Sequence, residues 1–228
     1  MTKPLTGQAL EQLLQEATII TLTGGIEVRL VVLENQDYRL LVLNGAIQSV
    51  QDKRDPARLV LAHQVPLLSA LAGLPTNGKV LELGLGGGSA MAHARKHFPT
   101  LNWLCLEQSA SVISLYFDHF GPEIVVPEQC ILMADAYEWL TGKGQGEQFN
   151  LVLCDVYERL DVQFLEACAR AVKPGGVLAI NWLPHMQNDD LGGEELDRCT
   201  AISGWSRNKQ KIAGFRNRVY QLTRPVHE

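Results

Sequence analysis

Apolar runs that alternate with segments of helical length constrain this chain more than any other feature. Five such runs follow Lys79, namely VLEL, NWLCLE, QCILMA, FNLVLCD and GVLAINW. Runs that are apolar at nearly every position suit strands buried on both faces of a parallel sheet. Their alternation with helices predicts a doubly wound α/β domain over 55–228. A later run, VYQLTR, predicts a last strand that lies antiparallel at the edge of this sheet.

Residues 17–51 have a different texture. The short runs ATIITLT, IEVRLVVLE, YRLLVL and AIQSV are separated by turn residues. The last two runs flank Asn44-Gly45, the strongest short-range sign of a hairpin. We therefore predict a small antiparallel β module over 1–54, in front of the α/β domain.

The segment that joins the two regions looks helical. Asp55 is a suitable N-cap and Pro56 suits the first helical position. The sequence predicts one helix from here to Gly73, kinked or divided at Pro66.

Composition limits the class of protein. The chain has 228 residues, of which 46% are hydrophobic and 20% charged, as in an ordinary soluble protein. The net charge of −5 disfavours a general nucleic-acid binder. No run reaches the roughly 18 uncharged apolar residues of a membrane span, and the first residues lack the order of a signal peptide. The five cysteines form no C-x-x-C pair, so we expect buried, reduced thiols and a cytoplasmic protein.

The first apolar run leads into the glycine-rich sequence GLGGGSA. Gly84, Gly86 and Gly88 alternate, and such a loop lets a ligand approach the backbone closely. A helix that begins near Ser89 would direct free N–H groups at that ligand. The dinucleotide pattern G-x-G-x-x-G would need glycine or alanine at Ser89, so G-x-G-x-G of nucleoside-binding methyltransferases fits better. The alternative is a glycine-rich turn without a ligand.

Acidic residues follow three of the predicted strands. In open α/β sheets, ligands lie outside the carboxyl ends of the strands. Glu107 is placed to accept hydrogen bonds from both ribose hydroxyls, or is simply an acid at a helix start. Asp135, with Ala136 beside it, is placed to accept the exocyclic amine of adenine, or to serve as a helix N-cap.

Asp155 ends the fourth run and Glu158 follows three residues later. Two such carboxylates could hold a cationic amine or accept a proton. The alternative is a helix cap followed by an acid that suits the helix dipole.

Other polar groups give weaker patterns. His93 and His97 share a helix face without a third ligand, so we expect a solvated face and no metal site. The C-terminal region is basic, which we interpret as a charged edge hairpin rather than an RNA contact; its cations are Arg207, Lys209, Lys211, Arg216, Arg218 and Arg224.

Together these residues resemble the spermidine synthase family, within the class I methyltransferase-like fold. LLVLNGAIQ is similar to the LVLDG-x-x-Q of that family's N-terminal hairpins, LAHQVPLL to its entry helix and VLELGLGGGSA to its glycine loop. The resemblance implies that Glu107 is the ribose acid, Asp135 the adenine-side acid and Asp155 the start of the catalytic loop. It also implies that Gln48 and Tyr157 contact the substrate, and that the chain forms homodimers.

The sequence departs from the family pattern at three places. The family's D-S-S-D loop is replaced by D-V-Y-E at 155–158, and its Tyr-His/Gln-Glu triplet by Arg-Leu-Val at 58–60. Gly88-Ser89 stands where Asp-Gly is usual, and little sequence follows the fifth run to close an acceptor pocket. We therefore expect poor aminopropyl transfer to putrescine.

The sequence thus predicts a transferase that binds S-adenosylmethionine or its decarboxylated form, without a metal. It would move a methyl or related alkyl group to an unidentified small molecule, such as an amine. Alignment and desolvation would do most of the catalysis, with Asp155 orienting or deprotonating the acceptor and Glu158 assisting. One alternative is a true polyamine aminopropyltransferase. Another is a catalytically weak nucleoside-binding or interaction protein.

Overall fold

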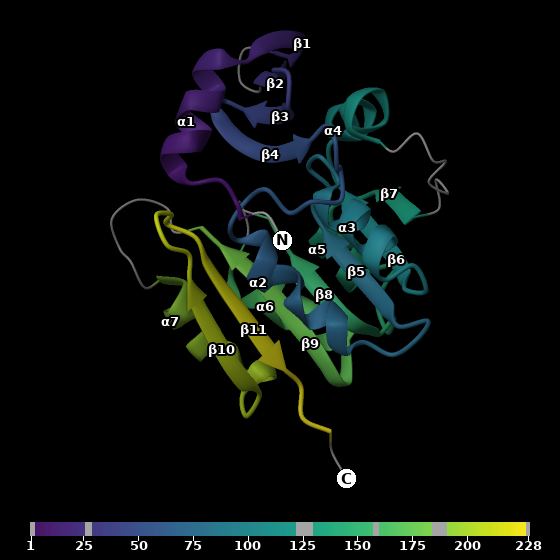
Figure 1. Ribbon diagram of the computed structural model, residues 1–228. Coiled ribbons are helices and arrows are strands. Elements are labelled where there is room, and N and C mark those ends of the chain that lie inside the picture. The colour runs from purple at the N-terminus through teal and green to yellow at the C-terminus, as the bar shows by residue number, and fades with distance from the viewer. Residues whose placement is uncertain (1–2, 26–28, 122–129, 157–159, 184–190, 227–228) are drawn as a thin grey trace.

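The structure is a computed structural model, and it describes residues 3–25, 29–121, 130–156, 160–183 and 191–226. Its strands form two sheets, one of four strands and one of seven. The small sheet lies beyond one end of the large sheet (Figure 1). Among the helices in these ranges, we find none whose length and apolar content would let it span a bilayer.

The small sheet is antiparallel and follows the chain order. Its strands are β1 (Thr18–Gly24), β2 (Arg29–Glu34), β3 (Tyr38–Leu43) and β4 (Ala46–Asp52). Between β3 and β4, Asn44 and Gly45 have φ values of 49° and 85°. Positive φ at both central residues is what a two-residue hairpin turn of type I′ requires. The predicted β module is therefore confirmed over its strands, whereas its status as a separate domain stays a prediction.

A helix that the sequence analysis did not predict covers one face of this sheet. Helix α1 spans Gly7–Glu16 and is capped by Thr6, whose hydroxyl accepts a hydrogen bond from Ala9 N. Its buried Leu10 and Leu13 lie three residues apart on one face and pack against apolar side chains of the sheet.

The large sheet has the predicted α/β architecture. Its order is β10-β11-β9-β8-β5-β6-β7, and the five strands from β5 to β9 pair in parallel. The strands are β5 (Lys79–Leu83), β6 (Asn102–Glu107), β7 (Ile131–Met133), β8 (Phe149–Cys154), β9 (Val172–Trp182), β10 (Ser206–Lys211) and β11 (Arg218–Thr223). The five predicted parallel strands and the fold class are confirmed. The expected burial on both faces was wrong for β7, where Leu132 and Met133 are exposed because this strand lies at the edge of the sheet.

The prediction for VYQLTR was wrong in one respect. This run forms β11, which is antiparallel as expected but lies inside the sheet, because β10 pairs with its outer side. All six residues of β10, SRNKQK, are exposed. A strand without apolar residues shows no hydrophobic periodicity, so no apolar run indicated β10. The two strands form the charged edge hairpin that the basic residues suggested.

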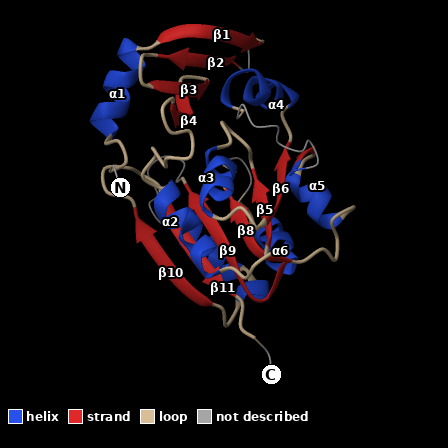
Figure 2. Ribbon diagram, turned by 45° about the vertical axis from the view of Figure 1, so that its right-hand side comes forward, coloured by secondary structure: helices blue, strands red, loops and turns tan. Residues whose placement is uncertain are grey.

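Helices cover both faces of the large sheet (Figure 2). One face packs against α5 (Ala136–Thr141), α6 (Val162–Ala171) and α7 (Leu191–Arg198), and the other against α2 (Gln64–Leu68) and α3 (Ser89–His97). A further apolar cluster joins the two sheets, with Leu30 and Val32 of β2 beside Met91 of α3 and Leu115 of α4 (Ala110–Leu115).

The predicted helix from Asp55 to Gly73 was wrong over its first half. Residues 55–63 are turns and irregular chain, α2 begins only at Gln64, and a 3-10 helix follows over Ser69–Gly73. The carbonyl of Val60 accepts a hydrogen bond from Leu5 N at 2.9 Å, and the Val60 side chain is fully buried. This tertiary contact outweighs local helix propensity. Pro66 lies in the first turn of α2, where no helical N–H is needed, so it causes no kink.

Candidate functional site

The candidate site lies where β8, β5 and β6 end side by side. Gly84 N, just after β5, donates to Leu106 O of β6 at 2.9 Å, and Asp155 N, just after β8, donates to Leu83 O of β5 at 3.1 Å. The glycine loop, Glu107 and Asp155 therefore lie together at the carboxyl ends of the parallel strands, where ligands bind in open α/β sheets.

The backbone of the glycine loop explains the alternating glycines. Gly84, Gly86 and Gly88 have φ values of 92°, 51° and 68°, a region that other residues rarely adopt. A Cβ at Gly84 would lie 2.9 Å from Asp155 O, and one at Gly88 would lie 2.3 Å from the Tyr116 ring. The backbone geometry alone therefore requires glycine at these positions. This agrees with the alternative stated above, a glycine-rich turn without a ligand, and does not by itself indicate ligand binding.

The small sheet reaches the glycine loop through β4. Ser49 Oγ accepts a hydrogen bond from Gly87 N at 2.8 Å, and Ser49 is buried. The preceding residue, Gln48, is the extra residue of a β-bulge between the pairs Leu41–Ser49 and Val42–Ile47. Bulges re-aim side chains and are frequent beside active sites. Contact of Gln48 with a substrate stays a prediction.

The start of α3 holds an unsatisfied hydroxyl. Ser89 is 6% exposed, and its Oγ has no hydrogen-bond partner in the part of the chain that the structure describes. The helix has no side-chain cap at Gly88. Buried polar atoms are almost always paired, and helix N-termini favour acceptor groups and anions. This corner of the site is therefore suited to a polar ligand atom.

Glu107 connects the glycine loop to the next helix. Its Oε2 accepts from Leu85 N at 3.0 Å, and its Oε1 accepts from Ser109 N at 2.8 Å. Ser109 is in turn the N-cap of α4. Each carboxylate oxygen retains a second lone pair, so Glu107 can still accept hydroxyl donors while these two backbone bonds fix its position.

Asp135 also lies at the carboxyl ends of the strands, after β7. Its Oδ1 accepts from Glu138 N at 2.8 Å, so it is the N-cap of α5, and Ala136 is the first residue of that helix. Ala134 N donates to Glu107 O at 3.0 Å, which brings the two acidic positions together. The helix-cap role that the sequence offered for Asp135 is thus present, and the adenine contact stays a prediction.

Asp155 is held by polar groups that the sequence analysis missed. Asn181 Nδ2 of β9 donates to Asp155 Oδ1 at 2.7 Å, and Asn181 Oδ1 accepts from Asn217 Nδ2 at 3.0 Å. The other carboxylate oxygen, Oδ2, lies 3.8 Å from Nε2 of His63. Asp155 therefore has a fixed orientation, with one oxygen facing an imidazole.

His63 is buried at the start of α2. Burial lowers the pKa of its imidazole below 6.5, and the negative charge of Asp155 opposes this shift only in part. A neutral imidazole next to a carboxylate can take up a proton. His63 was missed because it belongs to the segment predicted as a continuous helix. Asn181 left a sign in the sequence: it is the single amide in the apolar run GVLAINW.

A buried acid of β5 was also missed. Glu82 of β5 is 4% exposed, and burial raises its pKa to about 8. Trp103 Nε1 donates to Glu82 Oε2 at 2.7 Å. Burial thus favours the protonated carboxyl group over the carboxylate. An acid inside the apolar run VLEL was the sign that could have identified it.

Two predicted residues cannot be placed. Tyr157 and Glu158 lie outside the described residues, so the pairing of two carboxylates after β8 stays a prediction.

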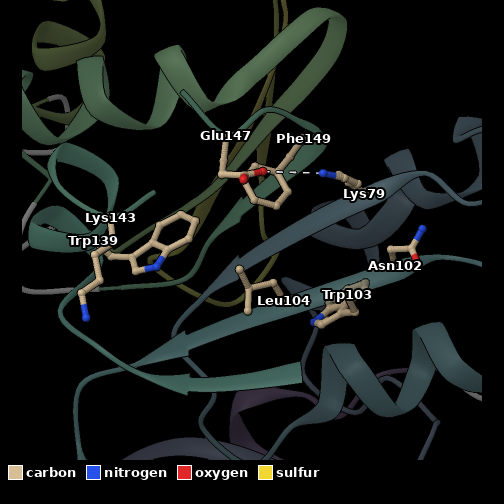
Figure 3. Close-up of a pocket in the computed structure, with 8 residues that line it drawn as sticks. All are labelled: Lys79, Asn102, Trp103, Leu104, Trp139, Lys143, Glu147 and Phe149. Atoms are coloured by element: carbon tan, nitrogen blue, oxygen red, sulfur yellow. Dashed lines mark ion pairs between the residues drawn. The ribbon is translucent and has the colours of Figure 1, made fainter. Parts of the chain in front are cut away.

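The cavity in Figure 3 lies away from this site. Its volume is about 320 Å³. It includes Lys79, Asn102 and Phe149, which begin β5, β6 and β8, so it opens at the amino ends of the strands. Lys79 Nζ lies 3.5 Å from Glu147 Oε2 across it. It contributes nothing to the carboxyl-end site.

The two histidines of α3 have structural contacts. His93 Nδ1 lies 2.9 Å from Ala57 O, and the rings of His93 and His97 are 4.6 Å apart. Within the described ranges, no group of three His, Cys, Asp or Glu side chains could hold a metal ion.

Among the sequence relatives of the chain are a polyamine aminopropyltransferase and a spermidine synthase. No family model matches the chain. It is 27% identical over 161 residues to the polyamine aminopropyltransferase of Chromobacterium violaceum, a match over 65% of this chain and 59% of that protein. It is 26% identical over 151 residues to spermidine synthase 1 of Pisum sativum, over 61% of this chain and 43% of that protein. These matches span less than two thirds of either relative.

Solved structures show the same fold. The spermidine synthase of Thermotoga maritima superposes with a TM-score of 0.70 at 16% identity, over 92% of this chain and 73% of that one. Human methyltransferase-like protein 13 in complex with SAH superposes with a TM-score of 0.54 at 20% identity, over 72% and 79%. The chain thus has a class I methyltransferase-like fold. In sequence it is similar to spermidine synthases, so the resemblance seen in the sequence is confirmed.

Proposed function

We propose that this chain binds S-adenosylmethionine or its decarboxylated form and transfers an alkyl group from the sulfonium to a small amine. One observation carries the proposal. At the ends of the two strands that flank β5, Glu107 accepts a hydrogen bond from the glycine-loop amide of Leu85, and Asp155 is oriented by Asn181. Such a pair of fixed carboxylates suits a ligand with a ribose at one end and a reacting group at the other.

The nucleoside half would be held by groups from three strand ends. Glu107 accepts the ribose hydroxyls with its remaining lone pairs. Asp135 accepts the adenine amine beside Ala136, and the buried hydroxyl of Ser89 offers a further polar contact. The glycine loop carries these groups on a backbone close enough to touch the ligand.

Asp155 and His63 would position the acceptor amine and take up its proton. The bound sulfonium supplies an electrophilic carbon: the acceptor nitrogen bonds to it while the carbon–sulfur bond breaks, and the electron pair stays on sulfur. Asp155 fixes the amine and takes the proton that it loses, and the neutral imidazole of His63 can share that proton. Glu158 and Tyr157 are proposed to assist from the following loop.

The amine is proposed to be one other than putrescine. Where spermidine synthases carry a Tyr-His/Gln-Glu triplet, Arg58 here donates to Asp52 Oδ2 at 2.7 Å and Val60 is fully buried. Neither offers an acceptor group to a diamine. We also propose a cytoplasmic location, which the five free cysteines support.

A product assay tests the proposal. Purified chain is incubated with each sulfonium donor and a panel of mono- and diamines, and alkylated products are detected by mass spectrometry. The proposal expects an alkylated amine and the matching thioether nucleoside. Binding of both donors without any product would favour the catalytically weak nucleoside-binding alternative. Spermidine formed efficiently from putrescine would favour the aminopropyltransferase alternative.

A further inference from the structure

The cavity at the amino ends of the parallel strands is not used by the proposed reaction. It lies at the opposite end of the sheet from Glu107 and Asp155, and its volume is about 320 Å³. Cavities that hold small ligands measure roughly 300–1,000 Å³. This one therefore has room for a molecule built on one or two rings.

The floor of the cavity is apolar. Leu104, Trp139 and Phe149 line it and pack in the same apolar cluster on one face of the large sheet. Phe149 is buried, and the rings of Trp139 and Phe149 are 6.4 Å apart at an angle of 50°. Figure 3 shows the two rings beside Leu104. Such a floor suits a flat aromatic group.

The turn after α5 holds the indole of Trp139 in place. A Cβ at Gly144 would lie 2.2 Å from that ring, so the ring lies directly on the Gly144 backbone. Gly144 N donates to Trp139 O at 2.8 Å, and Glu147 N donates to Gly144 O at 3.0 Å. The same turn thus fixes part of the floor and the backbone of Glu147. A preformed surface of this kind lowers the cost of ordering on binding.

The rim is cationic, although the chain as a whole has a net charge of −5. Lys79 and Lys143 face a single acid of the lining, Glu147. Lys79 Nζ lies 3.5 Å from Glu147 Oε2, and both side chains are about half exposed. Exposed ion pairs contribute little free energy. Lys79 can therefore exchange Glu147 for the anion of a ligand.

We propose that this cavity binds a small aromatic acid, with one or two flat rings and a carboxylate. The ring lies against Trp139 and Leu104, and the carboxylate displaces Glu147 from Lys79. Figure 3 shows Lys79 and Lys143 on opposite sides of the Trp139 indole, so the floor lies between two cations. An aromatic cation could also stack on an indole, but the excess of lysines at the rim favours an anion.

Titration with 2-naphthoate, followed by NMR of the tryptophan indole N–H signals, tests this site on the full chain. Trp139→Phe identifies the signal of Trp139. We expect this signal to shift until it saturates. Acetate lacks the ring and should bind at least about tenfold more weakly. The cation 2-naphthylmethylammonium keeps the ring and should bind about fivefold more weakly or less. Equal or tighter binding of this cation would overturn the choice of an acid.

Charge variants at the exposed rim test the contact with Lys79. Lys79→Met should weaken 2-naphthoate binding by about two- to fivefold, the range of an exposed ion pair. Glu147→Gln removes the competing carboxylate and should strengthen binding by a similar factor. Lys211→Met, on β10 at the other side of the sheet, is the matched control and should bind as the wild type does. An affinity that neither rim variant changes would overturn the contact.

The result must also be independent of the nucleoside site. Binding of 2-naphthoate should be the same in Glu107→Gln and in the presence of methylthioadenosine. A failure of the proposed reaction would leave these outcomes unchanged. Competition by methylthioadenosine, or a Trp139 signal that does not shift to saturation, would overturn the cavity as the binding site.

Discussion

Asn181 donates a 2.7 Å hydrogen bond to Oδ1 of Asp155, and this leaves Oδ2 as the oxygen nearer His63. The bond joins the carboxyl end of β8 to the carboxyl end of the neighbouring strand β9. The bond holds the carboxylate in one orientation. A general acid or base needs such a fixed orientation, because it must lie within hydrogen-bond reach of the proton that it transfers.

Replacing the carboxylate should separate binding from chemistry. Asp155→Asn keeps the size of the side chain but removes the charge and the proton acceptor. We expect nucleoside affinity to be unchanged and turnover to fall by about 10²–10⁴-fold, the usual contribution of a positioned acid or base. Calorimetry and a product assay on the same preparation measure both. Turnover within about tenfold of the wild type would make Asp155 a structural residue.

Removing the amide should destabilise the fold. Asn181→Ala leaves Asp155 Oδ1 and Asn217 Nδ2 without their partner. We expect a loss of about 0.5–1.5 kcal/mol in the free energy of unfolding, the net contribution of a typical hydrogen bond, because both partners are only partly buried. Urea denaturation measures it, with the exposed Asn208→Ala on β10 as the matched control. Equal midpoints for the two variants would contradict the hydrogen-bond network.

The imidazole of His63 should titrate below its usual value. Burial lowers its pKa from 6.5, and the charge of Asp155 raises it in part. The folded protein therefore resists this protonation, and the stability contributed by neutral His63 is lost as the pH falls through 6.5. NMR titration should show a lower pKa still in Asp155→Asn and no change in Asp135→Asn. A pKa above 6.5 in the wild type would contradict the burial.

Glu82 should give the opposite dependence on pH. Its pKa rises from 4.5 in the unfolded chain to about 8 in the folded protein. Between these values the folded state holds a proton that the unfolded state has lost, so stability should fall as the pH rises from 4.5 to 8. Glu82→Gln should flatten this part of the profile, because it keeps an acceptor for Trp103 Nε1 and cannot ionise. If stability still falls with rising pH in Glu82→Gln, this pH dependence belongs to another group.

The sequence predicted the parts of the fold that leave a local pattern. The five parallel strands are short apolar runs and the Asn44-Gly45 turn is a dipeptide, so each is visible in a few neighbouring residues. Strand β10 and the irregular segment 55–63 depend on tertiary partners: β10 on β11, and Val60 on Leu5. No local pattern encodes those contacts.

The residues of the candidate site likewise fall into those that local sequence predicts and those that depend on tertiary contacts. The glycine loop, Glu107 and Asp155 follow from strand ends, so their positions could be predicted together. His63 and Asn181 reach Asp155 from α2 and β9, distant in sequence. Their contacts arise only when the helix layer and the neighbouring strand close around β8.

The central claim is that Glu107 and the glycine loop bind an adenine nucleoside sulfonium or its thioether. Calorimetry with S-adenosylmethionine, its decarboxylated form and methylthioadenosine tests it on wild type, Glu107→Gln and the control Glu147→Gln in the amino-end cavity. Glu107→Gln replaces one acceptor oxygen by a donor, so binding of at least one ligand should weaken by about 1–3 kcal/mol, while the control matches the wild type. Wild-type affinity in Glu107→Gln, or no binding of any of the three to the wild type, would contradict the account.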